Sequence, residues 1–188
     1  MATQRRSVFQ DQVRLPSTPQ NSSDIALIPY SQVNGVWTVP DDMVLDVAQQ
    51  AIEEGTFQGI FLEGRIDGPQ AFLLAMKSEN VVPVFFFVDK EPIGVACLTG
   101  FEGGRAFGHF LFLRKAWGKY TEHAGKLCLD YWFSFMVGNR PLFNVILGII
   151  PTKNHRAVEF VQKIGMKVLG SIPKMVCGES ATIVYMTR

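Results

Sequence analysis

The sequence predicts an α/β (α+β) domain built on a mixed, mostly antiparallel sheet with helices on both faces. The apolar patterns follow the order helix, helix, three strands, helix, strand, helix, strand, strand. That order places strand–helix–strand passages beside hairpin-like strands, which is typical of this fold class. The clearest passage is IIPTKNHRAVEFVQKIGMKVLG, residues 149–170, where a strand ends at a proline, a helix with one apolar face follows, and a glycine ends the helix.

Composition limits the function classes. The chain has 188 residues, 47% of them hydrophobic, which suits one well-packed domain. A formal net charge of +1 argues against a general nucleic-acid or membrane-surface binder. No apolar run reaches the roughly 18 residues that span a bilayer, and the first ten residues, MATQRRSVFQ, lack the apolar core of a secretory signal. We therefore expect a cytoplasmic location.

The cysteines and histidines suggest neither a disulfide nor a metal site. Cys97, Cys128 and Cys177 are odd in number and far apart, so we expect buried thiols. The three histidines show no metal-ligand spacing with them. The sequence therefore predicts no bound metal.

Residues 1–40 differ from the rest of the chain. They are rich in Gln, Ser, Pro and Arg and show no sustained period. We predict an extended N-terminal arm, with short apolar islands at 8–9 and 25–28 available for docking. The folded domain is predicted at 41–188, and the arm is a candidate for contacts within a protein assembly.

Each helix and strand of the domain is predicted from local sequence features. Asp41 or Asp42 caps a helix that Gly55 ends, and Pro69 lies in the first turn of a second helix, where its missing N–H costs nothing. Three strands follow, the first two in a hairpin, and then a long helix. A further strand, a helix capped by Thr152 or Asn154, and two strands complete the domain. The predicted strands cover 81–89, 93–101, 105–113, 143–150, 166–170 and 181–186, and the long helix covers 117–136.

A right-handed crossover should bring the strands at 105–113 and 143–150 together as parallel neighbours. Such neighbours leave a cleft at their carboxyl ends, where open sheets bind ligands. The connection into the long helix, LRKAWGKYTEHAGKL, enters that cleft. Unpaired amides at a helix start attract anions, and Gly118 permits close backbone approach. The alternative is a solvated basic turn.

Two motifs resemble the GNAT superfamily of N-acetyltransferases over roughly 41–188. The first is the basic glycine loop before the long helix. The second is N-x-x-A-x-x-x-x-x-K-I-G-M, matched by Asn154, Ala157, Lys163, Ile164 and Gly165, with Met166 in the place of the family's aromatic residue. The stretches Trp117-Gly118-Lys119 and Tyr131-Trp132-Phe133 are similar to the ribosomal-protein acetyltransferase branch. Small GNAT-like proteins of tailed phages look similar in the same loop and helix.

The resemblance implies a V-shaped splay between the two central parallel strands and acetyl-CoA as the cofactor. Pantetheine would pair with the free edge of the third strand, and a backbone N–H there would polarise the thioester carbonyl. Phosphates would lie at the start of the long helix, and an Asn would contact pantetheine or the adenylate side. The implied cofactor-binding residues are Phe110, Leu111, Phe112, Leu113, Arg114, Lys115, Gly118, Lys119, Tyr120, Thr121 and Asn154.

The sequence also departs from the family pattern. The second small residue of the phosphate loop falls on Tyr120, which either obstructs the pyrophosphate or donates its hydroxyl to it. The tyrosine that many members use as general acid falls on Val161, which cannot donate a proton. Tyr120, Tyr131 and Cys128 are candidates to replace it. Positioning alone supplies much of the rate in such sites, so activity does not require the acid.

Two residues are candidate general bases. His109 lies near the end of the third strand, and Glu122 lies in the first turn of the long helix. The plainer interpretations are a core histidine and a carboxylate favoured by the helix dipole. The predicted function is acetyl-CoA-dependent transfer of an acetyl group to a primary amine of a protein or small molecule. The alternatives are an inactive structural protein of an assembly such as a phage virion, anchored by its arm, or a domain that binds acetyl-CoA without chemistry.

Overall fold

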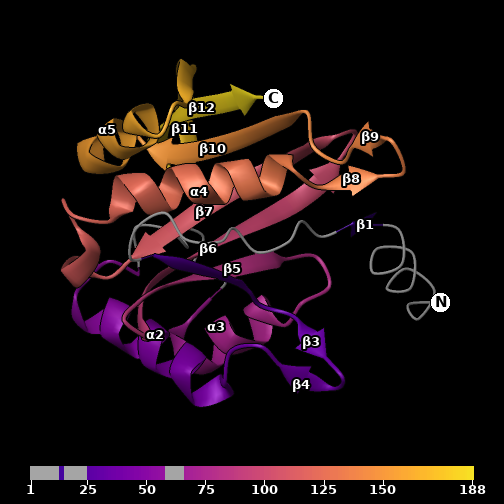
Figure 1. Ribbon diagram of the computed structural model, residues 1–188. Coiled ribbons are helices and arrows are strands. Elements are labelled where there is room, and N and C mark those ends of the chain that lie inside the picture. Colours follow the sequence, from indigo (N-terminus) through magenta and orange to yellow (C-terminus); the bar gives the residue numbers. More distant parts are fainter. Residues whose placement is uncertain (1–12, 15–24, 58–65) are drawn as a thin grey trace.

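The predicted fold class is confirmed by a computed structural model, which describes residues 13–14, 25–57 and 66–188 (Figure 1). A seven-stranded sheet has the order β11-β12-β10-β7-β6-β5-β2, in which β7 and β10 are parallel and the other neighbours antiparallel. One core cluster packs α2 and α3 on one face, and another packs α4 and α5 on the opposite face. The main elements are β2 Ala26–Pro29, α2 Asp41–Glu53, α3 Gly68–Met76, β5 Val82–Val88, β6 Glu91–Glu102, β7 Arg105–Phe112, α4 Thr121–Phe133, β10 Val145–Pro151, α5 His155–Lys163, β11 Lys167–Val176 and β12 Glu179–Thr187.

Helices α2 and α3 follow their apolar patterns. The buried residues of α2 recur at helical spacing and are Val44, Val47, Ala48 and Ala51. The N-cap is Pro40 rather than either predicted aspartate, and Asp41 and Asp42 lie in the first turn, where the helix dipole favours carboxylates. Pro69 lies in the first turn of α3, as expected. Among the described residues, no helix combines the length and the apolar character needed to cross a membrane.

The domain begins earlier than the predicted boundary at residue 41. Strand β2 pairs antiparallel with β5, from Ala26↔Phe87 to Pro29↔Val84, and Leu27 is 3% exposed. Short strands β3 (Gln32–Val33) and β4 (Val36–Trp37) then form a hairpin. Residues 25–40 are therefore part of the fold. Of the rest of the predicted arm, only β1 (Val13–Arg14) is described, paired with β8 (Met136–Val137), which also pairs with β9 (Arg140–Pro141); the island at 8–9 lies outside the described residues.

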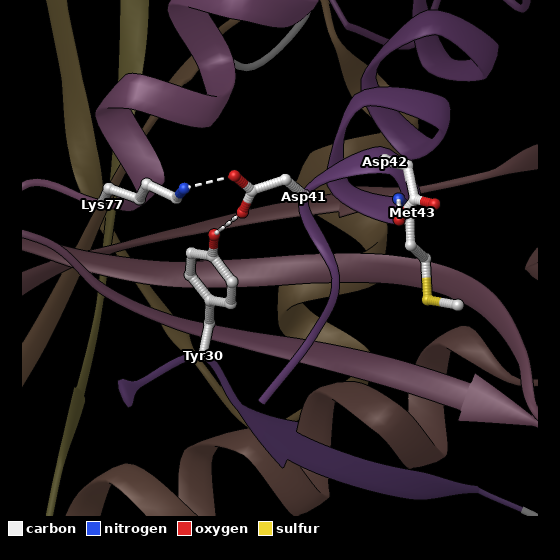
Figure 2. Close-up of polar contacts among 5 residues, drawn as sticks. All are labelled: Tyr30, Asp41, Asp42, Met43 and Lys77. Carbon is white, nitrogen blue, oxygen red and sulfur yellow. Dashed lines mark hydrogen bonds and ion pairs between the residues drawn. The ribbon is translucent and has the colours of Figure 1, made fainter. Parts of the chain in front are cut away.

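A polar network fixes this early segment to the two helices that follow it (Figure 2). The Tyr30 hydroxyl donates to Asp41 Oδ1 at 3.3 Å, and Lys77 Nζ donates to Asp41 Oδ2 at 2.5 Å. The Trp37 ring stacks on Tyr30 with centroids 4.6 Å apart and lies 5.1 Å from the Lys77 ammonium. Burial, with Asp41 adding to the effect, raises the pKa of Tyr30, so the phenol remains a donor.

The predicted long helix is shorter at both ends. Arg114–Ala116 forms a 3-10 turn, η1, and the chain passes through Gly118 at φ 73° before α4 begins at Thr121. A positive φ cannot continue a right-handed helix, so the glycine loop separates the two. Among the cysteines, Cys97 and Cys128 are buried as expected, whereas Cys177 is exposed.

Candidate functional site

The two parallel strands part in the middle of the sheet. Pairing between β7 and β10 covers only Arg105↔Val145, Ala106↔Ile146 and Phe107↔Leu147, although β7 continues to Phe112 and β10 to Pro151. Beyond Phe107 the strands therefore form the predicted V-shaped splay. Glycines lie on both strands just past this point, at Gly108 and Gly148. A Cβ on Gly148 would lie 2.8 Å from Val184, so the close packing there requires glycine.

A cavity of about 80 Å³ occupies the splay and is closed on one side by α5. Its walls come from β7, β10 and one face of α5. The lining residues are Gly108, His109, Phe110, Gly148, Ile149, Ile150, Ala157, Phe160, Val161 and Met166. Phe160 reaches across to β7, with its ring 5.4 Å from Phe110 and 5.5 Å from Phe112 between centroids. The cavity is therefore largely apolar and suits an uncharged chain.

The free edge of β7 offers backbone groups to this splay. The Leu113 N–H donates to the Ile93 carbonyl on β6 at 3.0 Å. Because successive strand residues direct their backbone groups to opposite sides, the N–H groups of Phe110 and Phe112 point away from β6. Strand β10 has diverged there, so these two groups have no strand partner on that side. Of the predicted set, Leu111 and Leu113 instead direct their backbone toward β6, and their side chains are buried.

The start of α4 is open at the same end of β7. The N-cap Tyr120 makes no side-chain capping bond, and within the described chain the amides of Thr121 and Glu122 make no hydrogen bond. A Cβ placed on Gly118 would meet nothing within 4 Å, so the loop faces open space. Free amides, the positive helix end and this open approach are together suited to binding an anion.

The basic residues of the loop are partly engaged elsewhere. The Arg114 N–H and guanidinium donate to Glu54 at the end of α2, at 2.6 and 2.7 Å. Lys115 lies 3.7 Å from Glu91. The Lys119 ammonium lies 4.5 Å from the centroid of the Tyr120 ring, and that ring packs against the core under α4. Tyr120 is therefore turned inward, and Arg114 ties the loop to α2.

His109 lies where the splay meets the opposite face of the sheet. It lines the cavity and also contacts a small apolar pocket that includes Phe72 and Met76 of α3. Its Nε2 is 2.9 Å from the Thr99 hydroxyl on β6. Burial lowers the pKa of His109, so the imidazole is neutral near pH 7 and can accept a proton.

The other acid–base candidates are placed less favourably. Glu122 is exposed on α4 and accepts from Lys126 at 2.6 Å, which lowers its pKa, and it does not line the cavity. Tyr131 and Cys128 are buried in the core, and burial raises the pKa of each. Neither is placed to act as the missing acid. Val161 lines the cavity at the position of the family's tyrosine.

Asn154 caps α5. Its side-chain oxygen accepts the Ala157 N–H at 3.2 Å, which is one of the two capping assignments that the sequence predicted. The Asn154 side-chain NH₂ makes no hydrogen bond within the described part of the chain. The described residues contain no cluster of His, Cys, Asp or Glu that could hold a metal.

The sequence reasoning missed several residues that the fold brings to the site. The sequence pattern places Phe160 on the apolar face of a helix and gives Arg156 on α5 no role. Arg156 lies 5.6 Å from the Trp117 ring centroid, although 39 positions separate the two residues, as their numbers show. The glycines inside two strands were the one available signal, since a strand glycine often marks a close approach of backbone or ligand.

No family model and no curated protein matches this sequence. Solved structures do match the fold. The chain is similar to RimL, a ribosomal L7/L12 α-N-protein acetyltransferase in complex with coenzyme A, at TM-score 0.68 and 9% identity, covering 88% of this chain and 95% of that one. It is similar to a GNAT-family acetyltransferase from Bacillus anthracis at TM-score 0.66 and 12% identity, covering 89% and 96%.

A further similar structure is AAC(6')-Ib in complex with paromomycin and acetyl-CoA, at TM-score 0.64 and 14% identity, covering 88% of this chain and 94% of that one. These matches span nearly the whole of the similar proteins. At such low identity they establish architecture. The chain therefore has the fold of the GNAT acetyltransferases.

Proposed function

We propose that this protein is an acetyl-CoA-dependent N-acyltransferase that transfers an acetyl group to a primary amine. The observation that carries the proposal is continuity: the open edge of β7 at Phe110 and Phe112 leads directly to the open amides at the start of α4. An extended apolar chain that ends in a pyrophosphate has the chemistry to fill both. Two of the similar proteins were solved with coenzyme A or acetyl-CoA, which supports the same ligand here.

The residues present fit this cofactor. The N–H groups of Phe110 and Phe112 would pair with the pantetheine, and one of them would polarise the carbonyl to be attacked. The amides of Gly118, Thr121 and Glu122 would hold the pyrophosphate. Phe160 and Ala157 would exclude water from the apolar section. Acetyl-CoA would supply the activated acetyl thioester.

His109 is the general base in this proposal. It is neutral, and it faces the side of the sheet that α2 and α3 cover. The amine would therefore approach from that side, opposite α4 and α5. When the amine attacks the thioester, His109 would accept the proton that the amine releases. Coenzyme A would leave as the thiolate and take up a proton from solvent. Tyr131 and Cys128 take no part, because both are buried in the core.

Calorimetric titration with acetyl-CoA tests the proposal, and we expect micromolar binding. Gly118→Glu should abolish it, because the new carboxylate would repel the phosphates and an L-residue is strained at φ 73°. Gly138→Glu is the matched control. Gly138 has φ 61° and open surroundings, and it lies between β8 and β9, beyond the C-terminal end of α4. This variant therefore carries the same strain and charge and should leave binding unchanged. If the wild type gives no heat and no rise in Tm with acetyl-CoA, the proposal fails.

A further inference from the structure

The mouth of the splay carries an exposed aromatic ring. Trp117 precedes Gly118 in the loop and is 43% exposed. Its indole Nε1–H donates to the backbone carbonyl of Phe112 at 3.2 Å, which fixes the ring beside the last free-edge residue of β7. A large apolar surface is thus held in solvent by a specific hydrogen bond, next to the amides at the start of α4.

Two guanidinium groups converge on this ring. The Arg114 Cζ lies 6.0 Å and the Arg156 Cζ 5.6 Å from the indole centroid. Arg114 is tied to Glu54, as described above. Arg156 is exposed on the first turn of α5 and makes no ion pair within the described chain. Two positive charges therefore lie beside the Trp117 ring, and only the Arg114 guanidinium is held by a hydrogen bond to another residue, Glu54.

A simple cation–π contact explains one arginine, since such a contact stabilises by about 0.5–1 kcal/mol at an exposed site. It does not explain why a second cation from another element shares the ring, because like charges repel. The arrangement suits a ligand that brings both a flat ring and an anion. Aromatic side chains and arginine together are the usual means of binding a nucleobase and its phosphate.

We propose that Trp117 and Arg156 form the subsite for the nucleotide end of the cofactor, with the indole stacking on adenine and the guanidinium pairing with the ribose 3′-phosphate. This inference rests on the proposed function and adds to it a selectivity for coenzyme A over dephospho-coenzyme A. Arg114 acts as a positioning residue that holds the loop under Trp117.

Calorimetry with coenzyme A and dephospho-coenzyme A tests the subsite. The wild type should bind coenzyme A about tenfold more tightly, the effect of one charge-assisted pair. Arg156→Gln should remove that ratio by weakening coenzyme A alone. Trp117→Leu should weaken both ligands by about tenfold and leave the ratio intact, because stacking does not sense the 3′-phosphate.

Two controls make the outcome specific. Arg140→Gln removes the same charge from the exposed end of β9 and should leave both affinities unchanged. Quenching of tryptophan fluorescence by coenzyme A should be lost in Trp117→Phe, in which Trp37 and the buried Trp132 remain. If the wild type binds both ligands equally, or Arg156→Gln weakens both equally, the subsite is disproved while the proposed function stands. If the wild type binds neither, the proposed function fails.

Discussion

The imidazole Nε2 of His109 lies 2.9 Å from the hydroxyl of Thr99, across the boundary between β7 and β6. The two residues sit diagonally, because the register pairs His109 with Cys97 and Thr99 with Phe107. The bond fixes the ring orientation and uses one ring nitrogen, which leaves the other for proton transfer. Of the two general bases that the sequence predicted, His109 and Glu122, only His109 lies beside the splay, as a neutral imidazole with a fixed orientation.

The first prediction concerns His109 in catalysis. His109→Gln keeps a polar side chain but cannot accept the proton, so kcat should fall by about 100-fold or more while the affinity for acetyl-CoA stays unchanged. Release of free thiol can be followed with a panel of primary amines that includes a polyamine, an aminoglycoside and a peptide with a free N-terminus. Thr99→Val should lower kcat less, because it loosens the ring without removing it. Full activity in the glutamine variant would exclude His109 as the base.

The second prediction concerns the pH dependence of stability. Burial lowers the pKa of His109 in the folded protein, so between that value and about 6.5 the unfolded chain binds more protons. Stability therefore rises with pH through this window and is lost as the pH falls below about 6.5. Thermal melts from pH 5 to 8 should show a shallower decline for His109→Gln than for the wild type. His155→Gln, which removes an exposed histidine, should retain the wild-type slope.

The third prediction concerns the Asp41 network. Lys77→Met keeps the apolar stem but leaves Asp41 without its cation, and the Lys77 side chain is only 24% exposed. We expect a loss of about 1 kcal/mol and a fall in Tm of about 2–4 °C. Tyr30→Phe should cost about as much, since it removes the hydroxyl bond to Asp41. Lys126→Met, which breaks an exposed pair on α4, should leave the Tm unchanged, and a similar drop there would show that the network has no special role.

Local sequence patterns were sufficient to predict some elements of the fold and not others. The helices and paired strands were predicted because apolar periodicity records which face of an element is buried. Strand β2 was missed because four residues, Ala26–Pro29, carry too little pattern alone. Their place in the sheet depends on pairing with β5, whose residues lie 55 to 61 positions further along the chain in the pairs Pro29↔Val84 and Ala26↔Phe87. The late start of the long helix, at Thr121 rather than at 117, reflects a single backbone angle at Gly118, which apolar periodicity does not reveal.

The candidate site likewise contains residues that the sequence predicts and residues that only the fold brings together. The loop from Arg114 to Thr121 is predicted by a contiguous motif, and the strand edge at Phe110 is implied by the family resemblance. Arg156 and Phe160 reach the site only because α5 packs over the splay. No spacing rule links them to Trp117 or Phe110, so sequence reasoning alone could not assemble this side of the cleft.

The last prediction concerns Gly125, where α4 meets α5. An alanine Cβ there would lie 2.8 Å from Ile164 Cγ2 and 2.9 Å from the Phe160 ring. Alanine favours a helix over glycine by about 1 kcal/mol, but overpacking against two buried or half-buried side chains costs about 1–3 kcal/mol. The clash should prevail, so Gly125→Ala should lower the Tm and, by pushing α5 outward, weaken acetyl-CoA binding. Adding Ile164→Val removes the nearer methyl group and should restore part of both. A variant as stable as the wild type, with unchanged affinity, would show that the two helices separate without disturbing the cleft.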